Sequence, residues 1–143
     1  MEVRDFIDQI EQQRKEQEAV YHSAAVRYGL SDSAMWIIYL VSDGGASYTQ
    51  QALCRECCCA KQTINTAINQ LVQKECVYLE AIPGTRNEKR VLLTKKGQAL
   101  VAGTTDLLKA AEARAYGKLT EEERSTYLEL TSRITGYLKM ELH

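Results

Sequence analysis

Proline is nearly absent from this chain, since Pro83 is the only one among 143 residues. Ala, Leu, Glu, Lys and Gln recur in long stretches on both sides of it, and these residues lose little side-chain freedom in a helix. Because proline is the strongest helix breaker, almost nothing interrupts helical hydrogen bonding. The sequence therefore predicts a mainly α-helical protein. Its length suits one globular domain and excludes most large multidomain enzymes.

Three features indicate a soluble cytoplasmic protein. The longest apolar run, residues 34–41, is far shorter than the ~20 residues needed to cross a bilayer. The N-terminus carries Glu2, Arg4 and Asp5 instead of an apolar signal segment. Four of the five cysteines lie within residues 54–59, which is too crowded for a regular disulfide framework and indicates a reducing compartment. We expect no contact with a membrane.

The net charge of −1 hides an uneven distribution of charge. Residues 55–96 carry 8 basic and 4 acidic side chains, residues 1–54 carry 4 and 8, and residues 97–143 carry 6 and 7. A basic middle between acidic ends is typical of a region that binds a polyanion. Ordinary scatter of solvated side chains explains it equally well, so charge alone leaves both interpretations open.

Hydrophobic residues recur at helical spacing along most of the chain. The predicted helices cover residues 3–28, 34–41, 50–57, 61–74, 94–111 and 120–138. The first has a charged, solvated middle from Gln12 to Glu18, and Gly29 suits its end. The second should end at residues 42–45. Capping residues are expected at Ser31, Thr49, Thr94 and Thr120, the last in a capping box with Glu123.

Pro83 and Gly84 lie between two strand-like runs, residues 77–82 and 89–93. Proline presets the first backbone angle of a turn and glycine permits the second, so the sequence predicts a two-stranded β-hairpin. Its tip, residues 85–89, is polar and partly basic.

The predicted helix at residues 61–74 has an unusual polar face. Its apolar stripe consists of Ile64, Ala67, Ile68 and Leu71. The other face carries Lys61, Gln62, Thr63, Asn65, Thr66, Asn69 and Gln70. Amides and hydroxyls both donate and accept hydrogen bonds, as the edges of DNA bases require. A plain polar surface is the alternative interpretation.

Two helices joined by a tight turn, followed by a basic-tipped hairpin, form a winged helix-turn-helix over residues 49–97. With its long flanking helices, the chain resembles the MarR family of bacterial transcriptional regulators. The motifs that carry the resemblance are Thr49-Gln50-Gln51-Ala52-Leu53, Lys61-Gln62-Thr63-Ile64-Asn65 and Leu93-Thr94-Lys95-Lys96-Gly97. Unlike many such regulators, the chain has Ala60 at the cap of the recognition helix and no Asp beside Arg86.

The resemblance implies a homodimer that binds a pseudo-palindromic operator in double-stranded DNA and represses transcription. Residues 30–104 would form the winged helix-turn-helix domain, and residues 1–29 and 105–143 the helical dimerisation region. The residues expected to contact base edges are Lys61, Gln62, Thr63, Asn65 and Thr66. The residue expected in a minor groove is Arg86, and those expected on phosphates are Lys74, Lys89 and Arg90.

Four aromatic residues of the first two helices are candidates for an effector site: Tyr21, Tyr28, Trp36 and Tyr39. They could line a cavity between the dimerisation helices and the DNA-binding lobe that takes a small aromatic or phenolic compound. Aromatic residues at helical spacing also serve as hydrophobic core, and this is the alternative.

The four clustered cysteines are Cys54, Cys57, Cys58 and Cys59. Their spacing is compatible with a metal ion, but zinc prefers four sulfur or imidazole ligands and the chain has only two histidines. In the winged-helix alignment, Cys54 and Cys57 fall on the inward stripe of their helix and Cys59 at the inward position of the turn. Free cysteine there acts as a small hydrophobe. We therefore expect packing, no metal site and an accessible Cys58.

Other function classes fit less well. A cysteine nucleophile needs a nearby base, and neither His22 nor His143 lies in a recognisable motif. There is no glycine-rich phosphate loop, so we expect neither an enzyme nor a cofactor. Two rivals to a DNA-binding regulator stay open. One is a cysteine-based thiol or metal sensor on the same scaffold, and the other is a protein-interaction module that does not bind DNA.

Overall fold

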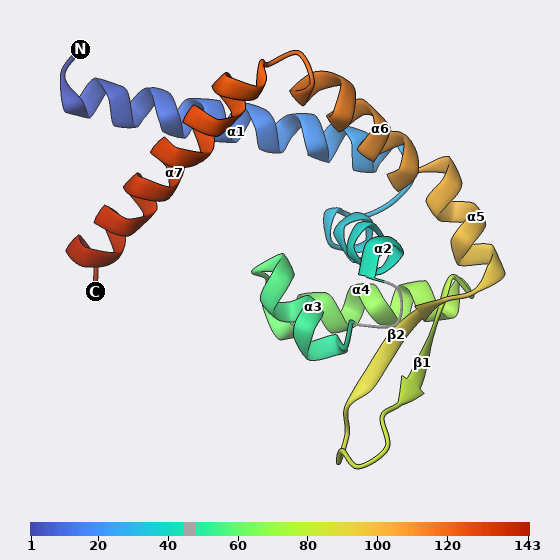
Figure 1. Cartoon of the computed structure of the whole chain (residues 1–143). Helices are drawn as coiled ribbons and strands as arrows, with labels where there is room; N and C mark the ends of the chain where they lie inside the picture. Colours follow the sequence, from blue (N-terminus) through green and yellow to red (C-terminus); the bar gives the residue numbers. More distant parts are fainter. Residues whose placement is uncertain (45–47) are drawn as a thin grey trace. The chain divides into compact units, whose positions relative to one another are not determined.

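The computed structural model describes residues 1–44 and 48–143 (Figure 1). The helices are α1 (Val3–Arg27), α2 (Asp32–Gly44), α3 (Gln50–Cys57), α4 (Lys61–Gln73), α5 (Lys95–Gly103), α6 (Thr105–Tyr116) and α7 (Glu121–Glu141). The strands β1 (Val77–Ala81) and β2 (Lys89–Leu93) pair antiparallel as a hairpin. The predicted mainly α fold with one hairpin is confirmed. The second helix ends within the predicted stretch 42–45, of which residue 45 lies outside the described residues.

The chain divides into two compact units, Met1–Leu107 and Leu108–His143. The first unit contains the helix-turn-helix and the hairpin, and the second contains α7 and most of α6. In the described part of the chain, no helix combines the length and the apolar character that a membrane span requires.

Polar side chains start the helices where the sequence predicts them. Ser31, Thr49 and Thr94 each accept a hydrogen bond from the backbone N–H three residues further on, at 3.0 to 3.1 Å. Thr120 and Glu123 form the predicted capping box, with each side chain accepting from the other's backbone N–H at 3.1 and 2.7 Å. Such a cap typically stabilises a helix by about 1 kcal/mol.

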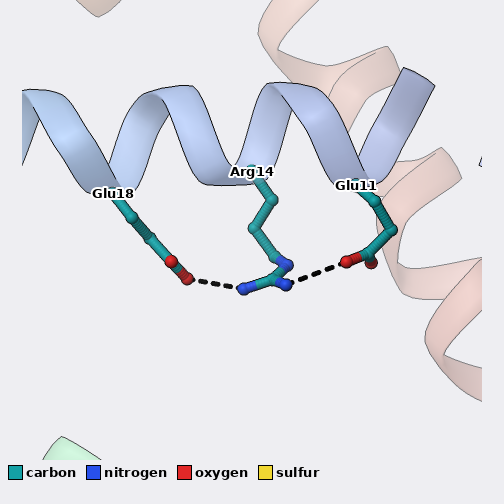
Figure 2. Close-up of polar contacts among 3 residues, drawn as sticks. All are labelled: Glu11, Arg14 and Glu18. Carbon is teal, nitrogen blue, oxygen red and sulfur yellow. Dashed lines mark hydrogen bonds and ion pairs between the residues drawn. The ribbon is translucent and has the colours of Figure 1, made fainter. Parts of the chain in front are cut away.

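The charged middle of α1 faces solvent, as predicted. Arg14 donates hydrogen bonds to Glu18 at 2.6 Å and to Glu11 at 2.8 Å, along one side of the helix (Figure 2). The hydrogen bond and the positive charge of Arg14 hold the pKa of Glu11 below its ordinary value. Because all three side chains are at least half exposed, these pairs order the helix surface and add little stability.

The hydrophobic core of the first unit lies where α2, α3 and α4 pack together and against the hairpin. The predicted apolar stripe of α4 (Ile64, Ala67, Ile68 and Leu71) is buried there. It meets Ile37 and Ile38 from α2, Leu53 from α3, Val77 from β1 and Val91 from β2. Full burial of an aliphatic side chain contributes about 1.5–3 kcal/mol to the stability of the fold. This shared core therefore holds α4 and the base of the hairpin in fixed positions relative to each other.

The start of α5 lies unusually close to the segment between α4 and β1. The Thr94 backbone N–H donates to the Cys76 carbonyl at 3.1 Å, and the Thr94 hydroxyl donates to the Glu75 carbonyl at 2.6 Å. A Cβ atom added at Gly97 would lie 1.9 Å from the Cys76 carbonyl oxygen, so only glycine fits there. These contacts hold the start of α5 against the segment that joins α4 to the hairpin.

One predicted helix is two helices in the structure. The sequence predicts continuous helix from Thr94 to Ala111, but α5 ends at Gly103 and α6 begins at Thr105. Thr104 interrupts them with φ −134° and ψ −85°, and its hydroxyl donates to the Leu100 carbonyl at 2.6 Å. Threonine side chains compete with the backbone for such acceptors, a local effect that apolar periodicity does not reveal.

Candidate nucleic-acid interface

A short turn joins α3 to α4 and sets the helix-turn-helix. Cys58 adopts a left-handed backbone conformation with φ +50° at the end of α3, and Ala60 precedes the first residue of α4. The hairpin is joined to the start of α3, because the Val91 backbone N–H donates to the Tyr48 carbonyl at 2.9 Å and Thr49 pairs with Arg90 in a β-bridge. The hairpin is therefore held against α3 and α4 by these hydrogen bonds and by the core that all three share.

The outward face of α4 carries the residues predicted to read bases. Lys61, Gln62, Thr63 and Thr66 are exposed, while Asn65 is half-buried. The apolar stripe on the opposite face holds the helix against α2 and α3. An α-helix presented this way fits the width of a DNA major groove. Four of the five predicted side chains are thus exposed to solvent on one face of the helix.

The N-terminal end of α4 is suited to a phosphate group. Ala60 at the cap has no side-chain acceptor for the first backbone N–H groups of the helix. These groups form the positive end of the helix dipole, and Lys61 adds a full positive charge next to them. A phosphate oxygen could accept the hydrogen bonds that a serine or threonine cap would otherwise take.

The hairpin ends in the predicted Pro-Gly turn. Gly84 has φ +80°, and both the backbone N–H and the hydroxyl of Thr85 donate to the Ile82 carbonyl, at 3.3 and 2.7 Å. Beyond this turn the side chain of Arg86 is exposed, as is that of Lys89 at the start of β2. Figure 1 shows the hairpin extending away from the helices of its unit, as a wing does.

Two residues predicted to contact phosphates lie apart from these. Arg90 faces Glu80 across the hairpin, with 3.6 Å between guanidinium and carboxylate, and its side chain is 40% exposed. Lys74 is exposed but follows the last residue of α4. At 1.5 Å per residue it lies about 20 Å along the helix from Lys61. Lys74 therefore lies near the start of the hairpin and not at the end of α4 that carries Lys61, Gln62 and Thr63.

The aromatic candidates for an effector site are partly brought together. The Trp36 ring lies 5.1 Å from Tyr21 and 5.2 Å from Tyr39, measured between ring centroids. All four predicted residues are half-buried. Tyr28, which caps the end of α1, makes no ring contact with the other three among the described residues. The cluster thus spans α1 and α2, with two aromatic edge or tilted contacts that stabilise it.

A contact between His22 and Asp32 was not predicted. The Nδ1 atom of His22 lies 2.8 Å from the Asp32 carboxylate, which joins the last turns of α1 to the start of α2. Helical periodicity places Tyr21 inward but gives no information on a partner ten residues away across a turn. The sequence offers one signal for this contact, which is the acidic Asp32 in the first turn of α2. An acidic residue at that position is already explained by its favourable interaction with the helix dipole.

The cysteine predictions are confirmed in part. Cys54 and Cys57 are partly buried against the core and Cys58 is exposed, as predicted. The prediction that Cys59 points inward is wrong, because Cys59 is exposed and its thiol donates to the Cys57 carbonyl at 3.2 Å. The left-handed residue before it redirects the chain outward. Among residues 1–44 and 48–143, no three His, Cys, Asp or Glu side chains are placed to share a metal ion.

Comparison with known proteins identifies the fold. No protein-family model and no curated protein matches the chain. A MarR family regulator from Neisseria meningitidis superposes with a TM-score of 0.81 at 15% identity, over 95% of each chain. A MarR family regulator from Listeria monocytogenes, complexed with 26-mer DNA, has a TM-score of 0.73 at 14% identity, over 94% of this chain and 89% of that one.

A third solved structure is that of BpsR from Bordetella bronchiseptica, which concerns regulation of its DNA binding by 6-hydroxynicotinic acid. It has a TM-score of 0.66 at 17% identity, over 89% of this chain and 98% of that one. At such low identity these likenesses establish the fold. The chain has the winged-helix fold of the MarR-family transcriptional regulators, as the sequence predicted.

Proposed function

We propose that this chain is a sequence-specific, DNA-binding transcriptional regulator without enzymatic activity, which acts in the cytoplasm. The observation that carries the proposal is the exposed polar surface of α4, with Lys61, Gln62 and Thr63 in its first turn and Arg86 on the adjoining wing. The similarly folded Listeria monocytogenes regulator was solved in complex with DNA, which supports the same use of this surface.

The proposed contacts follow from side-chain chemistry. The residues assigned to base edges in the major groove are Lys61, Gln62, Thr63, Asn65 and Thr66. Arg86 is assigned to a minor groove, whose width varies with sequence. The residues assigned to phosphates are Lys74, Lys89 and Arg90. Arg90 must leave or share its pair with Glu80 to do so, which costs little because both side chains are exposed.

We infer a homodimer from the apolar surface that single chains leave exposed. Helix α7 has no buried residue, although several of its residues are large and apolar. Among them, Tyr127, Leu130 and Ile134 are 50–60% exposed. Helix α1 likewise exposes Phe6, Ile7 and other apolar residues near its N-terminus. Large apolar surfaces of this kind are normally covered by a partner.

The proposed division of labour assigns DNA binding to residues 30–104 and dimerisation to residues 1–29 and 105–143. A two-fold dimer presents two copies of α4, and two-fold symmetry in the protein calls for a pseudo-palindromic operator with half-sites about 10 base pairs apart. Bound there, the dimer would exclude RNA polymerase and repress transcription.

We further propose that a small aromatic or phenolic effector releases the DNA. The cluster of Tyr21, Trp36 and Tyr39, with Tyr28 nearby in the chain, supplies aromatic surfaces for such a compound. The DNA binding of the similarly folded BpsR is regulated by 6-hydroxynicotinic acid, an aromatic compound.

Selection of genomic DNA fragments by the purified protein tests the central proposal and supplies the operator. Titrations of operator and scrambled duplex at several salt concentrations then separate the contacts. Gln62→Ala should weaken operator binding by roughly 1–3 kcal/mol and leave scrambled DNA almost unchanged, because only base discrimination is lost. Lys74→Ala should weaken both and make the slope of log affinity against log salt about one unit shallower.

Gln73→Ala provides the matched control, since it makes the same substitution three turns further along α4. It should leave the preference for operator over scrambled duplex unchanged. Arg86→Ala should weaken binding most at sites with A·T-rich flanks. Selection of no fragment, with no salt-dependent binding by the unaltered protein, would refute the proposal and favour a protein-interaction module.

A further inference from the structure

The turn between α3 and α4 presents two adjacent thiols to solvent. Cys58 and Cys59 are both exposed, whereas Cys54 and Cys57 are partly buried and Cys76 is buried. The Cys58 thiol donates to the Arg55 carbonyl at 3.6 Å, and the Cys59 thiol donates to the Cys57 carbonyl at 3.2 Å. Both sulfur atoms therefore lie over the last turn of α3, next to each other in the chain and open to a reagent.

Each of the two exposed thiols donates to a carbonyl oxygen, and among the described residues neither is hydrogen-bonded to a basic side chain. A thiolate attacks peroxide, and a neighbouring base or positive charge favours that thiolate. Burial and the three neighbouring thiols raise the pKa of Cys57 to about 11, which removes it as a thiolate partner. Two adjacent exposed thiols suit a reagent that bonds to both sulfur atoms at once.

A metal ion fits less well than a reagent that needs only two sulfur atoms. Zinc takes four ligands, while among the described residues no three potential ligands converge. Trivalent arsenic that already carries one organic group needs only two more bonds, and it forms them preferentially with sulfur. Two adjacent exposed cysteines supply those bonds within one turn of backbone.

We propose that Cys58 and Cys59 form a dithiol site for monosubstituted organoarsenic(III) compounds, and that its occupation lowers the affinity of α4 for DNA. In the reaction, R–As(OH)₂ and two thiols give R–As(S-Cys)₂ and two molecules of water. Two As–O bonds break and two As–S bonds form, and each thiol proton leaves in a water molecule. No atom changes oxidation state, so no oxidant or reductant is needed.

The position of the site connects it to DNA binding, and this half of the proposal rests on the proposed function. Cys59 stands two residues before Lys61 and next to Ala60, at the end of α4 assigned to a phosphate. An organic group held there occupies the space that the DNA backbone needs. The arsenic ring also joins Cys58, whose left-handed φ of +50° sets the direction of the turn.

The test uses the full-length protein and phenylarsine oxide, with intact-mass spectrometry as the first measurement. One equivalent should give a single phenylarsenic adduct that excess 2-mercaptoethanol does not remove and 2,3-dimercaptopropanol does. Cys58→Gly and Cys59→Ser should each abolish the resistance to the monothiol. Glycine at position 58 suits the left-handed backbone, so that variant keeps the turn folded. Cys54→Ser is the matched control and should retain the stable adduct.

Fluorescence anisotropy with an operator duplex is the second measurement. The adduct should weaken DNA binding about tenfold or more, comparable with the loss of one good base contact, and Cys58→Gly should be insensitive to the reagent. An adduct that both cysteine variants retain, or that 2-mercaptoethanol removes, would overturn the site. A stable adduct with unchanged DNA affinity would overturn the regulation. If the unmodified protein does not bind DNA, the proposed function is refuted, and the regulation with it. The mass measurement would still show whether Cys58 and Cys59 bind the arsenic compound together.

Discussion

Replacement of Gly97 by alanine should test the close joint between α5 and the start of the hairpin. An added Cβ atom would lie 1.9 Å from the Cys76 carbonyl oxygen, 2.9 Å from its carbon and 3.1 Å from the Leu93 side chain. A carbon atom and a carbonyl oxygen normally approach no closer than about 3.3 Å. The two backbones must therefore separate by about 1.4 Å, because the two nearest obstructing atoms belong to the Cys76 main chain and cannot rotate away.

The cost can be assembled from the contacts that this separation disrupts. Overpacking of a tight core typically costs about 1–3 kcal/mol. The displaced segment also accepts two hydrogen bonds from Thr94, through the Glu75 and Cys76 carbonyls, and each contributes about 1 kcal/mol. The total is about 3–5 kcal/mol, a large part of the roughly 5–15 kcal/mol that stabilises a typical domain. For a chain of this size the melting temperature should fall by roughly 10–20 °C.

Thermal and urea unfolding followed by circular dichroism would measure this loss. Gly103→Ala is the control, since it lies in the same helix and its added Cβ atom would meet nothing within 4 Å. That variant should be neutral or more stable by up to about 1 kcal/mol, as expected for alanine in place of glycine in a helix. A Gly97→Ala protein as stable as Gly103→Ala would refute the close approach on which this reasoning depends.

Three further predictions concern assembly, effector binding and thiol burial. Ile134→Asp should abolish the dimer in sedimentation at micromolar concentration, since it would place an unpaired charge in the proposed interface; a folded monomer of the unaltered protein would contradict it. A phenolic compound bound at the aromatic cluster should quench Trp36 emission and weaken DNA binding together, because coupling between sites is reciprocal; quenching with unchanged affinity would separate the two. The pKa of Cys57 is raised from 9.0 to about 11, so the unfolded thiol ionises first and stability is lost as pH rises through this range. Cys57→Ala should remove that decline in urea unfolding, and an identical decline in both proteins would assign it to other groups.

Local chemistry explains why most of the fold was predictable. Thr49 caps a helix through an N–H only three residues away, and Gly84 takes the positive φ that its turn requires. Each depends on a handful of neighbouring residues, which a sequence displays directly. The apolar stripe from Ile64 to Leu71 is equally local, and it determines which side chains of α4 face outward.

Features that depend on distant residues or on one dihedral angle were not predictable. The pair of His22 with Asp32 needs the angle between two helices, and the pair of Arg90 with Glu80 needs the register of the hairpin. The outward direction of Cys59 follows from one left-handed residue before it. In the proposed interface, residue types and their exposure could therefore be predicted, but the partners that compete with DNA could not.

The way the wing is closed has a consequence for how such a protein can evolve. The Ile82 backbone N–H donates to the Glu88 carbonyl at 3.0 Å, so the hairpin closes below its tip. Residues 83–88 are all exposed and contribute nothing to the core. Replacement of Arg86, Asn87 or Glu88 should therefore cost far less stability than replacement of the buried Val77 or Val91. If the proposed function holds, a descendant could change these side chains, and with them the DNA sites that it prefers, without altering the core.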